Sequence, residues 1–289
     1  MTPSIAILIP YFGPWPAWIN FFIESCRANG SIDWIVFNDA DPPENRAPNV
    51  RQERVSFAEY KVLVSDALDI RLTAAEPYKL CDVRPALPLV HADLVRRYDF
   101  VGYGDLDVVY GDIRAFYDDD TLSRYDLLSS HAGRVSGHFC LMRNSPEMVG
   151  AFREIRGWEK AFERDDYVNF DERAFYNLFR AKRAKLFGSP RPEARCLFRE
   201  AYSTPGADSG MRWYWQGGRL TNEFYPLHPF MYLHFMSWHS NRWYADQPGV
   251  GPVDEAPWAL VDDIVQMDWR KARREGFIIS RAGFQPIQR

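Results

Sequence analysis

The 289-residue sequence predicts an α/β fold in which helices flank a mainly parallel central sheet. Three observations predict it. Two short apolar runs, at residues 5–9 and 34–37, have the β-branched character of buried strands. A stretch at 18–28 places apolar residues at helical spacing between them, and strand, helix and strand in this order form a right-handed βαβ unit. A third apolar run, at 100–104, ends directly in acidic residues.

The remaining elements follow along the chain. A helix is predicted over 56–68, because Ser56 is a good N-cap and Glu59 lies at capping-box spacing. A helix is also predicted from Pro85 to Tyr98. Short strands and irregular loops are predicted over the aromatic-rich segment 202–244. Extended segments are predicted at 108–113, 126–130 and 139–142, and further helices at 145–156 and 171–185.

Composition narrows the class of protein. The formal net charge of -4 argues against a nucleic-acid binder that relies on bulk positive charge. Aromatic residues make up 16% of the chain, which fits either a rich core or a cleft lined with rings for sugars or bases. The cysteines form no CxxC pair, and the sequence has neither a signal-peptide pattern nor an apolar run long enough to span a membrane. Reduced thiols and a cytoplasmic location are therefore expected.

Asp105 and Asp107 are the strongest candidate functional residues. They follow a buried strand directly, and two carboxylates in a bend can both bind one hard cation such as Mg²⁺ or Mn²⁺. The carboxyl ends of parallel strands are also where ligands bind in open α/β sheets. The sequence therefore predicts a metal site at this strand end.

A second cluster contains Lys79, Asp82 and Arg84 just before a predicted helix. Asp82 can cap that helix. Alternatively, Lys79 or Asp82 contacts a nucleotide ribose or phosphate.

Two later clusters also allow two interpretations each. His234 and His239 lie among aromatic residues and are either core histidines or metal ligands. Asp171 and Glu172 lie at a predicted helix start, where they either complement the helix dipole or supply a catalytic base.

Together these clusters resemble the nucleotide-sugar-dependent GT-A glycosyltransferases. The segments 78–85 and 102–113 are similar to a poorly characterised bacterial branch found among surface-polysaccharide genes. The resemblance covers roughly the first 145 residues, and the late histidine ties the rest of the chain to it. It implies one continuous GT-A-like domain, with a nucleotide-sugar-binding half over 1–145 and an acceptor-side half over 146–289.

The resemblance implies a metal-dependent glycosyltransferase. It would move a sugar from a nucleotide sugar, with a UDP-sugar as the expected donor, to a glycan or lipid-linked acceptor. Asp105 and Asp107 would hold Mn²⁺ or Mg²⁺ against the donor diphosphate, and His234 would complete the metal shell. Asp171 or Glu172 would act as acceptor base if the enzyme inverts. The implied donor-binding positions for base, ribose, diphosphate and sugar are Pro10, Tyr11, Asp39, Lys79, Asp82, Arg84, Asp105, Gly137 and His138.

Two rival functions remain open. A sugar nucleotidyltransferase usually has a glycine-rich phosphate loop after the first strand, whereas residues 10–16 form a stiff aromatic loop here. A carbohydrate-binding protein would use aromatic platforms but needs no paired aspartates at a strand end.

The basic stretch 269–274 near the C-terminus has three interpretations. It is a solvated helix end, a peripheral contact with anionic lipid at the inner face of the membrane, where Trp269 or Phe277 could insert, or a site that attracts a phosphorylated acceptor.

Overall fold

The computed structural model describes residues 2–180, 195–200, 211–235, 238 and 263–287. At its centre lies a seven-stranded sheet in the order β3-β2-β1-β4-β7-β6-β8. Of these strands only β7 runs against its neighbours. The predicted mainly parallel α/β class is therefore confirmed. The strands are β1 (Ile5–Pro10), β2 (Ile32–Asn38), β3 (Val50–Arg54), β4 (Phe100–Gly104), β6 (Leu127–Ser129), β7 (Phe139–Arg143) and β8 (Cys196–Phe198).

The apolar run of β1 is explained by burial on both faces of the sheet. Ala6 and Leu8 pack into one hydrophobic cluster, whereas Ile5, Ile7 and Ile9 pack into another on the opposite face. A strand covered on both sides loses the polar alternation of a surface strand, so its sequence is continuously apolar. The sheet also crosses the expected boundary near residue 145, since β8 pairs with β6.

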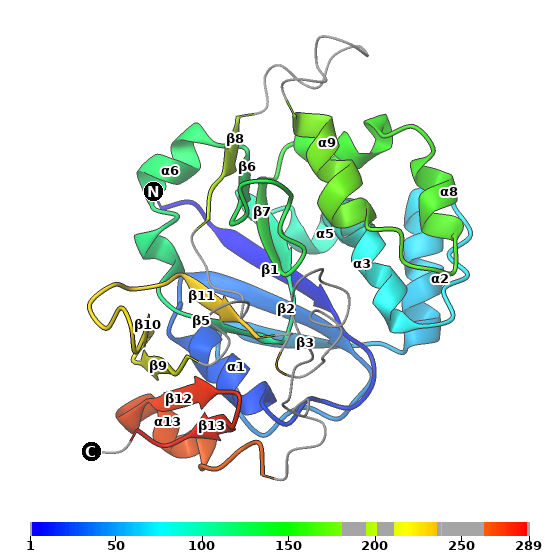
Figure 1. Cartoon of the computed structure of the whole chain (residues 1–289). Helices are drawn as coiled ribbons and strands as arrows, with labels where there is room; N and C mark the ends of the chain where they lie inside the picture. The colour runs from blue at the N-terminus through cyan, green and yellow to red at the C-terminus, as the bar shows by residue number, and fades with distance from the viewer. Residues whose placement is uncertain (1, 181–194, 201–210, 236–237, 239–262, 288–289) are drawn as a thin grey trace, which may run out of the picture.

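Helices cover both faces of this sheet (Figure 1). Helices α2 to α4 and α7 to α9 contribute to one hydrophobic cluster, and α1 contributes to the other. The capping box of α2 is confirmed, because Ser56 and Glu59 each accept a backbone hydrogen bond from the other. The α-helices are α1 (Ile19–Arg27), α2 (Phe57–Leu68), α3 (Leu80–Val83), α4 (Leu87–Val90), α5 (Ala92–Val95), α6 (Asp119–Arg124), α7 (Pro146–Val149), α8 (Trp158–Glu163), α9 (Phe175–Phe179) and α13 (Trp269–Glu275). Single helical turns lie at η1 (Pro77–Lys79), η2 (Arg84–Ala86), η3 (Ile113–Ala115), η4 (Ala151–Glu154) and η5 (Phe170–Ala174).

Several predicted elements differ from the structure. The helix expected from Pro85 is a series of short turns, because Pro85 and Pro88 interrupt the backbone hydrogen bonds. Strand β3 was not predicted, since its VRQER sequence is that of a polar edge strand paired only with β2. The helix expected over 171–185 begins in η5 and continues as α9, and residues 181–185 lie outside the described part.

A small second layer is built from the C-terminal part of the chain. Strand β5 (Val108–Tyr110) pairs antiparallel with β11 (Tyr232–His234). Strands β9 (Trp213–Gln216), β10 (Arg219–Asn222), β12 (Phe277–Ser280) and β13 (Gly283–Gln285) form a four-stranded sheet in the order β10-β9-β12-β13. This sheet packs on α1 through Phe21, which contacts Phe277 and Phe284.

The basic stretch forms α13, and two of its cations form ion pairs within the protein. Arg270 pairs with Glu44, and Arg273 Nε lies 2.7 Å from Glu24 Oε1. Phe277 is buried in β12 and cannot insert into a lipid surface without unfolding the strand. Phe277 is therefore part of the small sheet, and the expected lipid contact through Trp269 and the cations of this stretch stays a prediction. No helix among the described residues is long and apolar enough to cross a membrane.

Candidate functional site

The bend that follows β4 is fixed by three hydrogen bonds to its backbone. The N–H of Asp105 donates to the carbonyl of His138 (3.2 Å), and the N–H of Phe235 donates to the carbonyl of Asp107 (3.0 Å). The carbonyl between the two aspartates accepts from Trp18 Nε1 (2.9 Å). Because β7, α1 and the end of β11 all hold this bend, both carboxylates have a fixed direction.

His234 joins the two aspartates to form a candidate metal centre. The pairing of β11 with β5 sets His234 opposite Val108, next to Asp107. Ligand atoms of Asp105, Asp107 and His234 all lie within 4.8 Å of one another, and His234 Nε2 is 3.4 Å from Asp107 Oδ2. The alternative ligand, His239, lies outside the described residues.

The donor set fits a divalent cation. His234 is 4% exposed, yet among the described residues neither ring nitrogen has a hydrogen-bond partner. A buried polar atom without a partner destabilises a fold, so an imidazole in this state indicates a missing ligand. Two carboxylates and one imidazole suit Mn²⁺, since carboxylates favour Mg²⁺ and Mn²⁺ while imidazole favours transition metals.

His138 supports the ring of His234. The two imidazoles stack at 3.8 Å between centroids and 20° between planes. His138 Nε2 lies 2.8 Å from the hydroxyl of Tyr232, and burial together with the neighbouring His234 holds the pKa of His138 well below its ordinary value. A neutral, buried His138 therefore packs against the candidate ligand His234, and its own side chain is only 3% exposed.

We expect His234→Phe to separate metal binding from stability. The phenyl ring retains the stack on His138 and removes two buried unpartnered nitrogens, so the metal-free protein should gain about 1 kcal/mol of unfolding free energy. Loss of a residue that only supports a metal ligand costs up to about 100-fold in metal affinity. Loss of the ligand itself should therefore lower Mn²⁺ affinity by at least about 100-fold. Thermal denaturation with chelator and titration calorimetry with Mn²⁺ measure both effects.

The matched control is His91→Phe. His91 is also buried, but Tyr60 satisfies its Nε2 at 2.8 Å, so this change should destabilise the fold and leave Mn²⁺ affinity unaltered. Destabilisation by His234→Phe with unchanged Mn²⁺ affinity would restore the interpretation of a core histidine.

Arg84 connects the metal centre to the acidic helix start. Its guanidinium forms ion pairs with Asp105 and, at 3.1 Å, with Asp171 Oδ2. Burial raises the pKa of Asp171 to about 7, although the charge of Arg84 acts in the opposite direction. The other oxygen of Asp171 accepts from the hydroxyl of Tyr167 (3.1 Å). Asp171 is 0% exposed, and its two oxygens contact Arg84 and Tyr167.

Glu172 is the more accessible member of the acidic pair. Its side chain is 15% exposed, and Arg134 Nη1 lies 3.1 Å from its Oε2. A Cβ placed on Gly137 would lie 3.2 Å from Glu172 Oε1 and 2.8 Å from Arg84 Nη1. Gly137 therefore leaves the room that lets the carboxylates and Arg84 converge.

Lys79 and Asp82 hold the backbone that presents this acidic pair. Asp82 accepts hydrogen bonds from the N–H groups of Val168 (2.9 Å) and Phe170 (2.8 Å). Lys79 Nζ lies 2.8 Å from Asp82 Oδ2 and also donates to one backbone carbonyl within α8 and one after it. Both side chains are buried and fully engaged, so neither is available to a nucleotide in this structure. These tertiary contacts account for both side chains, and the expected contact with a nucleotide stays a prediction.

The ends of β1 and β2 lie near the metal centre. Tyr11 follows Pro10 at the end of β1 and stacks on Trp15 at 6.0 Å between ring centroids. Burial, and to a smaller extent the charge of Asp107, raises the pKa of Tyr11. Asp39 follows β2, and its Oδ1 accepts from a backbone N–H of the loop after β1 (3.0 Å). The carboxyl ends of the parallel strands thus bring Pro10, Tyr11 and Asp39 to the edge that carries the aspartates.

Three residues of the site were not predicted. Arg134 pairs with Glu172, Tyr167 bonds to Asp171, and Tyr78 contacts Tyr167 edge to face at 5.1 Å between ring centroids. None has a sequence pattern of its own, because each is brought to the acidic pair by tertiary packing.

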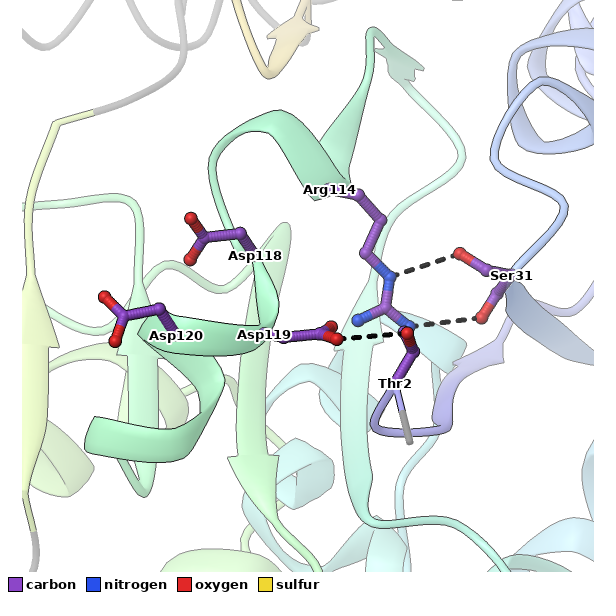
Figure 2. Close-up of a pocket in the computed structure, with 6 residues that line it drawn as sticks. All are labelled: Thr2, Ser31, Arg114, Asp118, Asp119 and Asp120. Atoms are coloured by element: carbon purple, nitrogen blue, oxygen red, sulfur yellow. Dashed lines mark hydrogen bonds between the residues drawn. The ribbon is translucent and has the colours of Figure 1, made fainter.

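A separate surface pocket lies at the opposite edge of the sheet (Figure 2). The pocket lies beside the residues that precede β1 and β2. The aspartate bend instead follows the carboxyl end of β4, which runs parallel to both strands. Asp118 caps α6, and Asp119 accepts from the Thr2 hydroxyl (3.0 Å), so local structure explains this acidic group. The lining residues are Thr2, Ser31, Arg114, Asp118, Asp119 and Asp120.

Comparison with known proteins gives one family match. A model described as "Family of unknown function (DUF6625)" matches residues 7–247. No curated protein matches the sequence.

Similar solved structures include an active-site mutant of LgtC (13% identity, 82% of this chain and 90% of that chain, TM-score 0.44). They also include a glycosyltransferase involved in glycosylation of the major capsid of PBCV-1 (11% identity, 80% and 93%, TM-score 0.42). A third is the apo-form glycosyltransferase GlyE of Streptococcus pneumoniae TIGR4 (18% identity, 92% and 61%, TM-score 0.41). At these levels of similarity, activity has to be inferred from the site.

Proposed function

The chain belongs to a family of unknown function (DUF6625), and for this member we propose metal-dependent transfer of a sugar from a nucleoside-diphosphate donor. The observation that carries the proposal is the cluster of Asp105, Asp107 and the buried His234 after the carboxyl end of β4, where neither ring nitrogen of His234 has a hydrogen-bond partner among the described residues. A cation held there would neutralise the charge of a leaving diphosphate. A UDP-sugar is the proposed donor, and a glycan or lipid-linked acceptor of bacterial surface-polysaccharide synthesis is the proposed acceptor.

The residues of the chain supply orientation and acid–base chemistry around that centre. Arg84 lies between Asp105 and Asp171, where a cationic fork can stabilise an anionic donor as well as orient the carboxylates. Glu172 is the accessible carboxylate and is proposed to accept the proton of the acceptor hydroxyl. Tyr11, stacked on Trp15, offers an aromatic wall for the donor base.

Calorimetric titration of UDP with and without Mn²⁺ tests this proposal directly. Heat that appears only with Mn²⁺ is expected, because the cation bridges protein and diphosphate. A screen of nucleotide sugars for metal-dependent hydrolysis would then identify the donor. Absence of UDP binding in both titrations would contradict the proposal and favour a binding module that ignores nucleotides.

We expect Gly137→Ala to cut turnover on the order of 10²-fold, since a misplacement of about 1 Å at a reacting centre has this effect. The added Cβ would lie 2.8 Å from Arg84 Nη1 and 2.9 Å from Asp171 Oδ2, whose ion pair leaves them little freedom to move. Turnover of the identified donor measures the effect.

Gly133→Ala is the matched control, because nothing lies within 4 Å of a Cβ at Gly133 in the same loop. Equal turnover in the two variants would mean that the convergence at Gly137 has no role in transfer.

A further inference from the structure

An ordered turn between β10 and β11 exposes three large apolar side chains. Phe224 is 67% exposed, Tyr225 58% and Leu227 87%, and these three residues are called the apolar tip below. The turn projects from the body of the molecule at the left of the view (Figure 1). The large apolar side chains exposed among the described residues are Val62, Leu63, Tyr78, Phe224, Tyr225 and Leu227. Half of this set thus falls within four consecutive positions.

Hydrogen bonds hold the turn so that the tip points outward. The N–H of Tyr225 donates to the buried Asn222 Oδ1 (2.8 Å), and its carbonyl accepts from the N–H of His228 (3.1 Å). Arg219 Nη2 donates to the carbonyl of Leu227 (2.9 Å). Because the backbone is fixed at these points, the apolar side chains cannot turn inward without breaking several bonds, and their exposure is a property of the fold.

The surroundings of the tip favour a lipid surface as its partner. Within the described segment 211–231 the charged side chains are Arg212 next to β9, Arg219 on β10 and Glu223, and all three are exposed. The Oε1 of Glu223 accepts from the Arg212 N–H (2.9 Å). The local charge is therefore positive in a chain of net charge -4. Aromatic side chains beside cations are the composition that enters a membrane interface with anionic headgroups.

The size of the tip argues against a second copy of the chain as partner. Three large side chains with these exposures offer on the order of 400 Å² of surface, taking 150–250 Å² for each when fully exposed. A stable dimer buries about 800 Å² on each partner. A bilayer sets no such requirement, since a few inserted side chains and nearby cations are enough for reversible binding.

We infer that the apolar tip inserts into the interface of an anionic lipid bilayer. The turn leads directly into β11, the strand that carries His234. The proposed membrane contact is therefore only a few residues along the chain from the candidate metal centre. It would bring a lipid-linked acceptor to the enzyme, and in that respect it extends the proposed function. Lipid binding itself needs no transferase activity, so the two proposals can fail separately.

Co-sedimentation of the full chain with vesicles tests this inference. Vesicles of phosphatidylcholine alone are compared with vesicles that also contain phosphatidylglycerol, for the natural chain and the double variant Phe224→Ser, Leu227→Ser. The natural chain should bind the anionic vesicles, and the variant should bind at least about tenfold more weakly. The matched control is Val62→Ser, Leu63→Ser on α2, which should bind as the natural chain does.

Three outcomes would overturn the inference. The natural chain fails to bind anionic vesicles, or the tip variant binds them equally well, or light scattering shows a dimer that the tip variant loses. Thermal unfolding checks that both variants fold. If the double variant unfolds early, Leu227→Ser alone, at the most exposed position, gives the same comparison.

Discussion

Asp107→Asn is expected to abolish turnover while the fold remains intact. The backbone of Asp107, rather than its side chain, is bonded to Phe235, and the carboxylate is 15% exposed in the metal cluster. A bound cation contributes several kcal/mol to stabilising a leaving diphosphate, so turnover should fall on the order of 10³-fold or more. A transfer assay at saturating Mn²⁺, with circular dichroism for the fold, measures this.

The control for Asp107 lies in the same segment of the chain. Asp112 is exposed and caps η3, a role that asparagine also fulfils, so Asp112→Asn should retain full turnover. Near-normal turnover of Asp107→Asn at saturating Mn²⁺ would contradict the assignment of Asp107 as a metal ligand.

The second large effect is expected at Asp171 and Glu172. Substitution of Glu172 should change kcat, whereas substitution of Asp171 should change donor affinity. Glu172→Gln should lower kcat on the order of 10²-fold or more, the scale of general-base catalysis, with donor binding nearly unchanged. Asp171→Asn should instead weaken binding of UDP with Mn²⁺, because Asp171 orients Arg84 and does not reach the solvent. Rate measurements on each variant, together with calorimetry, separate kcat from affinity.

If Glu172→Gln retains the full rate, the acceptor base lies elsewhere or the enzyme retains anomeric configuration, which requires no such base. The proposed role of Asp171 fails independently if Asp171→Asn binds UDP and Mn²⁺ as the natural chain does.

The aspartate bend could be predicted from the sequence because its signal is local. An apolar run such as that of β4 reports a buried strand, and acidic residues directly after it must lie at the strand end. His234 could be placed there only through a resemblance. Its position depends on the register of β11 against β5, which pairs segments more than a hundred residues apart in the chain. No window of sequence contains that information.

Lys79 and Asp82 show the opposite case, in which the local pattern left a helix cap and a nucleotide contact equally open. Alternating charges before a helix look like a surface that meets a ligand. Only the packing of α3 against the chain after α8 buries both groups and gives Asp82 two backbone N–H partners. The same tertiary contact explains why Asp171 lies where it meets Arg84.

The pairing of β5 with β11 has a consequence for how the molecule is assembled. The two aspartates leave the ribosome long before His234. Bringing β11 back to β5 closes the long segment of chain between them, which is slow and entropically unfavourable. The cluster of Asp105, Asp107 and His234 therefore forms only in chains in which β11 has paired with β5. A cation that binds this cluster would therefore bind the folded chain more tightly than partly folded chains. At a free concentration of 100 times its Kd, it would add about 2.7 kcal/mol to the stability of the finished state alone.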